Sequence, residues 1–215
     1  MQVVKMTRIN SKSGLAIVLS KLGGFFEPKV RQEQYLMDSE IGASMLWNAY
    51  LLGDVERKII ADLGCGTGIL GIGALLLGAK QAIFVDSDEK ALETAKKNLS
   101  KVKSEGYILG KVKFICQDIG KIKIKADIVL QNPPFGTKVS HADASFLEKA
   151  LETAPVVYSF HKSESKGFLE LFSAKKNAKI THAWGFRFPL KASFPFHRRQ
   201  IHRIDVSCFR FEKKA

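Results

Sequence analysis

From Lys58 onward, short apolar segments alternate with segments in which apolar residues recur at helical spacing. This alternation predicts strands separated by helices, which is typical of a parallel sheet with helices on both faces. The last two apolar segments have no helical segment between them, so we expect an antiparallel hairpin at the sheet edge. The expected strands are 58–63, 81–86, 112–118, 126–131, 155–160, 180–188 and 204–211, and the expected helices are 69–77, 89–102, 146–153 and 166–176.

The segment before these strands has helical periodicity of its own. Apolar residues recur at helical spacing over 15–22, and Asp38 or Ser39 is placed to cap a second helix. The expected fold is α/β, a seven-stranded, mostly parallel Rossmann-like sheet with an antiparallel last strand and an N-terminal helical extension. The length favours one domain over 1–215, with a helical cover over 1–57 and a core over 58–215.

The chain is strongly basic, with a formal net charge of +13 and a pI near 9.7. Such a surface indicates an anionic partner, of which nucleic acid is the commonest, and a protein that is basic only for solubility is the alternative. Cys65, Cys116 and Cys208 lie far apart without metal-ligand spacing. We therefore expect no disulfide framework and no metal site.

The sequence also bears on location. The longest apolar stretch, 68–79, is shorter than the about 20 residues that a membrane span needs. The first 14 residues lack the apolar centre of a signal peptide. We expect a cytoplasmic protein without a membrane partner.

The stretch DLGCGTGILG, Asp62 to Gly71, lies between the first core strand and its helix. Glycines let the backbone turn tightly and approach a ligand closely, while the helix N-terminus offers free N–H groups. This loop predicts a cofactor site. The spacing of Gly66, Gly68 and Gly71 also fits a dinucleotide fingerprint, and a plain tight turn is a further interpretation.

Polar side chains stand at the ends of several expected strands. Because the carboxyl ends of parallel strands meet at one edge, Asp62, Asp86, Asp118 and Asn132 are expected to rim one crevice. Asp62 can receive a cationic amino group and orient the loop, Asp86 can accept two ribose hydroxyls, and Asp118 can accept from an adenine amino group. Asp86 suits NAD equally well or caps a helix, and Asp118 could simply end its strand. Asp62 and the downstream Asn-Pro-Pro-Phe together favour S-adenosylmethionine.

The stretch NPPF, Asn132 to Phe135, follows the strand 126–131. Proline fixes φ at about −65° and has no N–H, so Pro133 and Pro134 stiffen this turn. The side-chain oxygen of Asn132 and the carbonyl of Pro133 can each accept one N–H of an exocyclic aromatic amine, which aims its lone pair at a methyl donor. Phe135 would stack on a flipped base.

These residues resemble the class I S-adenosylmethionine-dependent methyltransferases with Asn-Pro-Pro-Phe or Asn-Pro-Pro-Tyr, which modify adenine N6 or a glutamine amide. More closely, the chain resembles the methyltransferase-like family whose eukaryotic members make N6-methyladenosine in small-subunit ribosomal RNA, together with archaeal relatives. The likeness runs nearly end to end, through FFEPKVRQEQY, DLGCGTGILGIG, NPPFGTK, VYSFHKS and LKASFPFHRR. It implies a methyltransferase sheet with S-adenosyl-L-methionine as cofactor.

The resemblance also implies roles for single residues and a partner. One departure is Leu36-Met37, where the family commonly has Pro-Thr, which puts a hydroxyl contact to the cofactor in doubt. Eukaryotic members use a small zinc-ribbon activator protein that pairs with a sheet edge, which makes such a protein a candidate partner here. The implied cofactor contacts are Gln34, Gly64, Thr67, Asp86, Asp118 and Ile119, and the implied active-site residues are Asn132, Pro133, Pro134 and Phe135.

RNA contacts are predicted separately, from charge. Residues 187–203 carry five Lys and Arg residues and no acid, interleaved with phenylalanines, which suits phosphates and unpaired bases. A solvated basic loop is the alternative. His161 could position a phosphate or could end its strand with a hydrogen-bonded ring. The predicted RNA contacts are Lys138, His161, Lys162, Lys191, Phe196, Arg198, Arg199 and Arg203.

Three functions fit these observations. We favour an adenine-N6 RNA methyltransferase that acts on ribosomal RNA or a ribosomal subunit precursor. A glutamine-N5 protein methyltransferase is the second hypothesis, which the basic charge disfavours. A cofactor-binding RNA-interaction protein without turnover is the third, which the intact Asn132–Phe135 motif disfavours. A nicotinamide oxidoreductase is a distant fourth.

Overall fold

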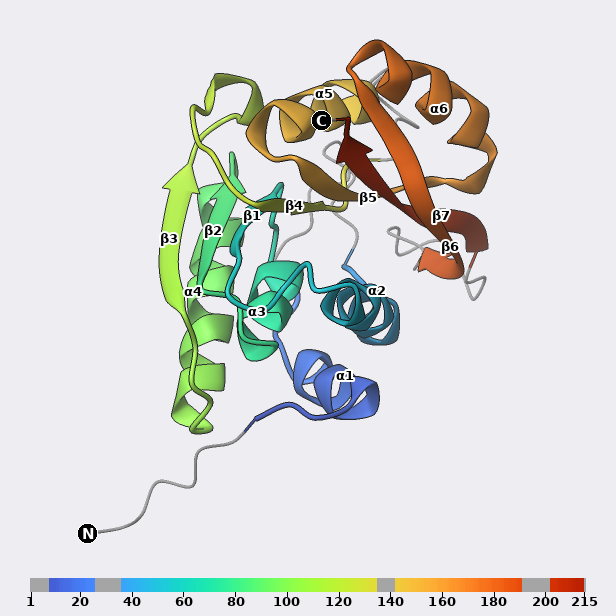
Figure 1. The fold of residues 1–215 in the computed structure, drawn as a ribbon. Coiled ribbons are helices and arrows are strands. Elements are labelled where there is room, and N and C mark those ends of the chain that lie inside the picture. Colours follow the sequence, from blue (N-terminus) through green and yellow to red (C-terminus); the bar gives the residue numbers. More distant parts are fainter. Residues whose placement is uncertain (1–7, 26–35, 135–141, 191–201, 215) are drawn as a thin grey trace, which may run out of the picture.

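The computed structural model describes residues 8–25, 36–134, 142–190 and 202–214, whose fold is drawn in Figure 1. Seven strands form one sheet in the order β3-β2-β1-β4-β5-β7-β6. Neighbouring strands from β3 to β5 are parallel, and β7 is antiparallel to both of its neighbours. These findings confirm the predicted α/β class and the antiparallel last strand. The strands are β1 (Ile59–Leu63), β2 (Gln81–Asp86), β3 (Lys111–Cys116), β4 (Ile128–Gln131), β5 (Val156–Lys162), β6 (Ala178–Leu190) and β7 (His202–Lys213).

Helices cover both faces of the sheet, with α1 to α4 on one face and α5 and α6 on the other (Figure 1). Each predicted helix is present, and two short 3-10 turns were not predicted. Within the described ranges, no helix combines the length and apolarity that a membrane crossing requires. The helices are α1 (Lys12–Ser20), α2 (Ser39–Leu51), α3 (Ile69–Leu76), α4 (Glu89–Ser104), α5 (Ala142–Thr153) and α6 (Lys166–Lys175), and the 3-10 turns are η2 (Ile119–Lys121) and η3 (Ser163–Ser165).

Two apolar cores lie on opposite faces of the sheet. Successive side chains of a strand point to opposite faces. On β1, therefore, Ile60 joins the core beneath α1 to α4, whereas Ala61 joins the core beneath α5 and α6. Burial on both faces explains why the central strands read as nearly continuous apolar runs.

The N-terminal helices share the first of these cores. Oδ1 of Asp38 accepts the N–H groups of Glu40 and Ile41 at 2.9 and 3.1 Å, so α2 is capped as predicted. Leu15 of α1 and Met45 of α2 are fully buried against the sheet-facing helices. The division of the chain into a cover and a core stays a prediction.

The sheet order determines where a ligand can bind. From β1 the strand order runs through β2 to β3 on one side and through β4 to β5 on the other. Leu63 of β1 pairs with Gln131 of β4, so the carboxyl ends of these two strands are adjacent. Open α/β sheets bind ligands where the strand order reverses in this way. The loops after Leu63 and Gln131 are thus the candidate site.

Candidate active site

The loop after β1 consists largely of glycines in conformations that other residues avoid. Gly64 and Gly66 have φ values of 65° and 52°. A Cβ at Gly64 would lie 2.9 Å from the Phe146 ring, and a Cβ at Gly66 would lie 2.8 Å from the Phe25 ring. Both positions need glycine for conformation and for space. The result is a stretch of bare backbone leading into the N-terminus of α3, which suits a closely approaching cofactor.

Asp62 links the end of β1 to the first turn of α3, on the far side of this loop. Its buried carboxylate accepts the N–H of Gly71, in the first turn of α3, at 2.8 Å through Oδ2. Burial raises the pKa of Asp62 to about 7, the Gly71 hydrogen bond opposes the rise, and the nearby charge of Asp86 adds to it. A cation bound nearby would favour the ionised form. The predicted contact with an amino group stays a prediction.

Asp86 ends β2 beside the same loop. Its Oδ2 accepts the N–H of Gly66 at 2.8 Å, and its Oδ1 accepts the N–H of Asp88 at 2.9 Å. Burial raises the pKa of Asp86, and these backbone hydrogen bonds lower it in part. Asp88, and not Asp86, is the N-cap of α4. Asp86 is therefore held by the glycine loop, and its contact with a ribose remains a prediction.

Asp118 follows β3 on the same edge of the sheet. Its Oδ1 accepts the N–H of Gly120 at 2.8 Å and caps η2. The N–H of Gln117 donates to the carbonyl of Asp86 at 2.9 Å, which places this segment next to the end of β2. Asp118 is exposed and Ile119 is partly buried. The alternative that the sequence left open was that Asp118 simply ends its strand, but β3 ends at Cys116. The capping role of Asp118 is compatible with a ligand contact.

Asn132 directly follows β4 and carries a buried side-chain acceptor. Its Oδ1 is buried and has no hydrogen-bond partner among the described residues, and the same holds for Oε1 of Gln131. A buried polar atom without a partner costs free energy, so such atoms are rare and need an explanation. Pro133 is buried and Pro134 is half-buried. The stiff turn thus holds an open acceptor at the candidate site.

A buried polar chain lies directly behind this turn. Nε2 of Gln131 donates to Oγ of Ser159 at 2.9 Å, and the same oxygen lies 2.7 Å from Nε2 of His161. His161 is 1% exposed, so its ring cannot reach a phosphate unless the strand opens. This corrects the predicted RNA contact at His161, which is instead a hydrogen-bonded strand residue. Lys162 stays partly exposed, 4.0 Å from a carboxylate oxygen of Glu164.

Several other predicted site residues lie outside the described ranges, and Arg203 lies near the edge of one. Arg203 lies in β7 opposite Pro189 of β6, in the half of the hairpin nearer its tip. Within the described residues, no group of three or more His, Cys, Asp or Glu side chains is placed to hold a metal ion. The predicted residues outside the described ranges are Gln34, Phe135, Lys138, Lys191, Phe196, Arg198 and Arg199.

Sequence reasoning missed residues that support the site from a distance. Asn98 of α4 hydrogen-bonds the carbonyl of Thr67, which belongs to the glycine loop and is itself buried. The aromatic rings of Phe25 and Phe146 pack against bare glycine backbone. The only signal for Asn98 is a polar residue at a position of α4 that faces the core, between Ala95 and Leu99.

The site fits one cofactor class. A bare glycine loop, a carboxylate at the end of β2 and a buried amide oxygen after β4 suit a cofactor that contains adenosine. Together with the sheet order, they define a class I S-adenosyl-L-methionine-dependent methyltransferase.

Comparisons with known proteins agree with this class. The family model described as ribosomal protein L11 methyltransferase (PrmA) matches residues 47–133. An uncharacterized protein of Methanocaldococcus jannaschii is 36% identical over 94% of both chains. The rRNA N(6)-adenosine-methyltransferase METTL5 of Danio rerio is 34% identical over 90% of this chain and 94% of its own length. The crystal structure of PH1948 from Pyrococcus horikoshii, described as a candidate RNA methyltransferase, has a TM-score of 0.87 and 43% identity, covering 96% of this chain and 100% of that one.

The chain belongs to the METTL5 family of methyltransferases, because the likeness covers almost the whole of both sequences. The predicted resemblance is therefore confirmed, as is the predicted enzyme class.

Proposed function

We propose that this protein transfers a methyl group from S-adenosyl-L-methionine to N6 of an adenosine in ribosomal RNA. The observation that carries the proposal is the buried Oδ1 of Asn132, which has no hydrogen-bond partner among the described residues and follows the strand next to the glycine loop. The METTL5 proteins of Danio rerio and Drosophila melanogaster, both 34% identical to this chain, are rRNA N(6)-adenosine-methyltransferases. Small-subunit RNA is the substrate that we expect, and the cytoplasm is the location.

The protein's part in the reaction is to position the target nitrogen. When bound, the cofactor supplies an electrophilic methyl group on a sulfonium ion. Oδ1 of Asn132 and the carbonyl oxygen of Pro133 accept the two N–H groups of the adenine amine, which turns the nitrogen lone pair towards that methyl group. Phe135 stacks on the flipped base. The methylated nitrogen then loses one proton to water, so no strong base is required.

RNA binding is the role that we propose for the predicted basic and aromatic residues. We assign the phosphate and base contacts to Lys138, Lys162, Lys191, Phe196, Arg198, Arg199 and Arg203, as the charge pattern predicts.

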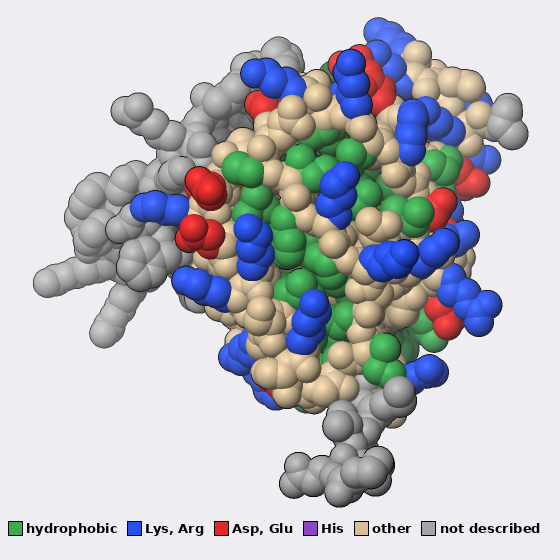
Figure 2. Space-filling view, turned by 90° about the vertical axis from the view of Figure 1, so that its left-hand side faces the viewer, with side chains coloured by type: hydrophobic (Ala, Val, Ile, Leu, Met, Phe, Trp, Pro, Cys, Tyr) green, Lys and Arg blue, Asp and Glu red, His purple; other side chains and the backbone are tan. Residues whose placement is uncertain are grey.

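A small zinc-ribbon protein is the partner that we propose for the β3 edge. Within the described part of the chain, β3 pairs with β2 alone, so its other edge is open to strand addition. Figure 2 shows this side of the molecule, where apolar side chains fill a shallow hollow among lysines. Phe114 and the 52% exposed Ile108 are apolar residues of this region, and Lys96 lies over the Phe114 ring. A partner strand with apolar residues flanked by acidic ones would match this apolar region and the lysines around it.

Binding of that partner can be tested at two exposed aliphatic residues, Ile108 and Leu171. Ile108→Glu should weaken co-purification of a purified zinc-ribbon protein about tenfold, because a charge replaces apolar contact. Leu171→Glu, on α6 and 70% exposed, is the matched control and should have no effect. Equal binding by all three proteins would remove β3 from the proposal.

A protein substrate is the second candidate function. The PrmA model, whose description names ribosomal protein L11, matches this chain over 47–133. That match contains the cofactor loop and ends within the Asn-Pro-Pro-Phe motif, so it does not extend to residues that would select a substrate. We therefore place RNA first.

The deciding experiment supplies tritium-labelled S-adenosyl-L-methionine with ribosomal RNA, DNA and total protein in separate reactions. The label should enter RNA and, after nuclease digestion, co-migrate with N6-methyladenosine. Label in glutamine would move the substrate to protein, label in DNA alone would reject RNA as the substrate, and label in none of the three would reject transfer.

A further inference from the structure

Asn98 joins two segments that are far apart in the sequence. It lies in α4 with 4% exposure. Its Oδ1 accepts the N–H of Gly23 at 2.7 Å, while its Nδ2 donates to the carbonyls of Gly23 and Thr67 at 2.9 Å each. Gly23 follows α1, and Thr67 lies in the glycine loop that receives the cofactor. One amide therefore holds the N-terminal segment and the cofactor loop at once.

The orientation of this amide is fixed by its partners. A flipped Asn98 would set its NH2 group against the N–H of Gly23 and its oxygen against two carbonyls. Both N–H donors and one acceptor site are used in the observed orientation. A Cβ at Gly23 would lie 3.3 Å from Oδ1, so the backbone approaches as closely as glycine permits. The contact is specific in both partners.

A second contact joins the same two segments. The ring of Phe25 packs on the backbone of Gly66, where a Cβ would lie only 2.8 Å from it. Residues 23–25 thus contact the cofactor loop at Gly66 directly and at Thr67 through Asn98. Gly64, Gly66 and Gly68 all have positive φ, so this loop has much conformational freedom to lose when it is ordered.

We infer that Asn98 is a positioning residue that couples the N-terminal segment to the cofactor loop. The loop conformation that binds cofactor and the docked state of residues 23–25 stabilise each other through its amide. If the docked segment strengthens cofactor binding, then bound cofactor must protect the docked segment to the same extent. The inference rests on cofactor binding at this loop, and it adds a residue and a segment that cofactor contacts alone would not identify.

The test compares Asn98→Ala with Lys101→Met in the full chain. Lys101, one turn along the same helix, donates from Nζ to the carbonyl of Lys21 at 2.8 Å in an exposed position. Asn98→Ala removes two hydrogen bonds between α4 and the N-terminal segment and Lys101→Met removes one, but Asn98→Ala alone also releases the cofactor loop. Calorimetry with S-adenosylhomocysteine should show affinity about tenfold weaker for Asn98→Ala and changed by less than about twofold for Lys101→Met.

Hydrogen exchange gives a readout that does not depend on activity. In the wild type, adding S-adenosylhomocysteine should slow amide exchange in residues 21–25, and in Asn98→Ala this protection should be lost. Phe25→Ala provides a second variant if Asn98→Ala does not fold, and it should weaken both affinity and protection. Unchanged affinity and protection in a folded Asn98→Ala or Phe25→Ala protein would overturn the coupling, whereas no binding by the wild type would reject the cofactor site itself.

Discussion

Two groups of buried polar side chains differ in how completely they are satisfied. At the β5–β7 side of the sheet, Asp54 accepts from the Tyr158 hydroxyl at 2.6 Å and from Nε of Arg210 at 2.7 Å. Nη1 of Arg210 also donates to Thr181 and Glu212 at 2.8 Å each. After β4, by contrast, Oε1 of Gln131 and Oδ1 of Asn132 have no partner among the described residues.

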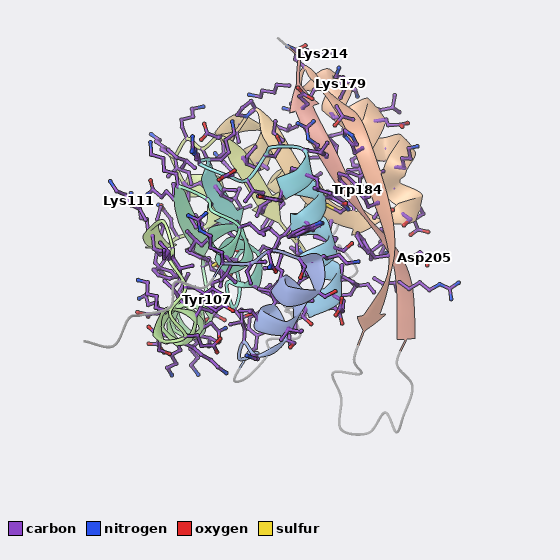
Figure 3. All side chains as sticks on the ribbon, turned by 60° about the horizontal axis from the view of Figure 1, so that its bottom comes forward. Tyr107, Lys111, Lys179, Trp184, Asp205 and Lys214 are labelled. Atoms are coloured by element: carbon purple, nitrogen blue, oxygen red, sulfur yellow. The ribbon has the colours of Figure 1, made fainter. Side chains whose placement is uncertain are left out.

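We interpret the first group as stabilising the fold and the second as available to a ligand. A buried ionic network that uses its donors and acceptors internally has no capacity left for a ligand. Buried acceptors left open keep a penalty in the free protein that a substrate can relieve. Figure 3 labels Trp184 on the β6–β7 hairpin, and its ring stacks on Tyr158 of the closed network with the ring centroids 6.0 Å apart. We therefore expect substrate contacts at the second group.

Breaking the closed network should have the largest effect on stability. Arg210→Ala leaves Asp54 buried without its cation, so the free energy of unfolding should fall by about 3–5 kcal/mol. The matched control is Lys166→Ala, which removes an exposed pair with Glu170 at 3.8 Å and should cost at most about 0.5 kcal/mol. Urea unfolding measures both, and equal losses would show that the network is no more than a surface pair.

The pH dependence of stability should reveal Asp62. Its pKa is about 7 in the folded protein, against about 4 in the unfolded chain. Between these values the folded state keeps a proton that the unfolded state has lost, so this group's contribution falls as the pH rises from about 4 to about 7. The total is at most about 4 kcal/mol. Asp62→Asn retains an acceptor for Gly71, and in cofactor-free protein it should lose this part of the slope.

An equal change in the free energy of unfolding between pH 4 and pH 7 in wild type and Asp62→Asn would show that Asp62 is already ionised in the folded protein.

Cofactor affinity should depend on Asp86. Asp86→Ala removes a charged acceptor for two ribose hydroxyls, which should weaken binding by about 1.5–3 kcal/mol in calorimetry. Asp88→Ala is the neighbouring control, because Asp88 caps α4 through the N–H of Lys90. It should lower stability by about 0.5–2 kcal/mol and leave affinity unchanged. Unaltered affinity in Asp86→Ala, or NADH binding of equal strength, would contradict the assignment.

The smallest effects on stability and turnover are expected at Ser159, behind the turn that contains Asn132. Ser159→Ala removes the oxygen that Gln131 donates to, so stability should fall by about 1–2 kcal/mol and turnover should fall severalfold as the turn loosens. Ser207→Ala breaks a similar hydroxyl pair, 2.8 Å from Ser163, on β7, which is one strand further from β4 than Ser159 is. It should lower stability without slowing turnover. A matching loss of turnover in both variants would reduce Ser159 to a general structural role.

Much of this could be predicted from local sequence. Periodicity located the strands because central strands are buried on both faces, and the Asp38 cap followed from a polar residue before an apolar helix. The glycine loop and the proline turn were visible because their residues restrict the backbone directly. The order of the strands was not predicted, although the alternation with helices leaves few topologies to choose from.

Long-range pairs could not be predicted in this way. Asp54 and Arg210 are 156 positions apart, and Asn98 and Gly23 are 75 apart. Nothing local distinguishes these residues from solvated ones until the fold brings them together. The same reason explains the error at His161, whose polar type suggested a ligand contact although its place in β5 buries it.

The central claim is that the open acceptor of Asn132 serves the reaction and not the fold. Single-turnover transfer from S-adenosyl-L-methionine to ribosomal RNA, scored as N6-methyladenosine, tests it in the Asn132→Ala protein. We expect a rate lower by about 10²–10³, with cofactor affinity within about twofold of the wild type. Stability should be equal or slightly higher, because a buried acceptor without a partner is removed. A near-normal transfer rate in a folded Asn132→Ala protein would contradict the account.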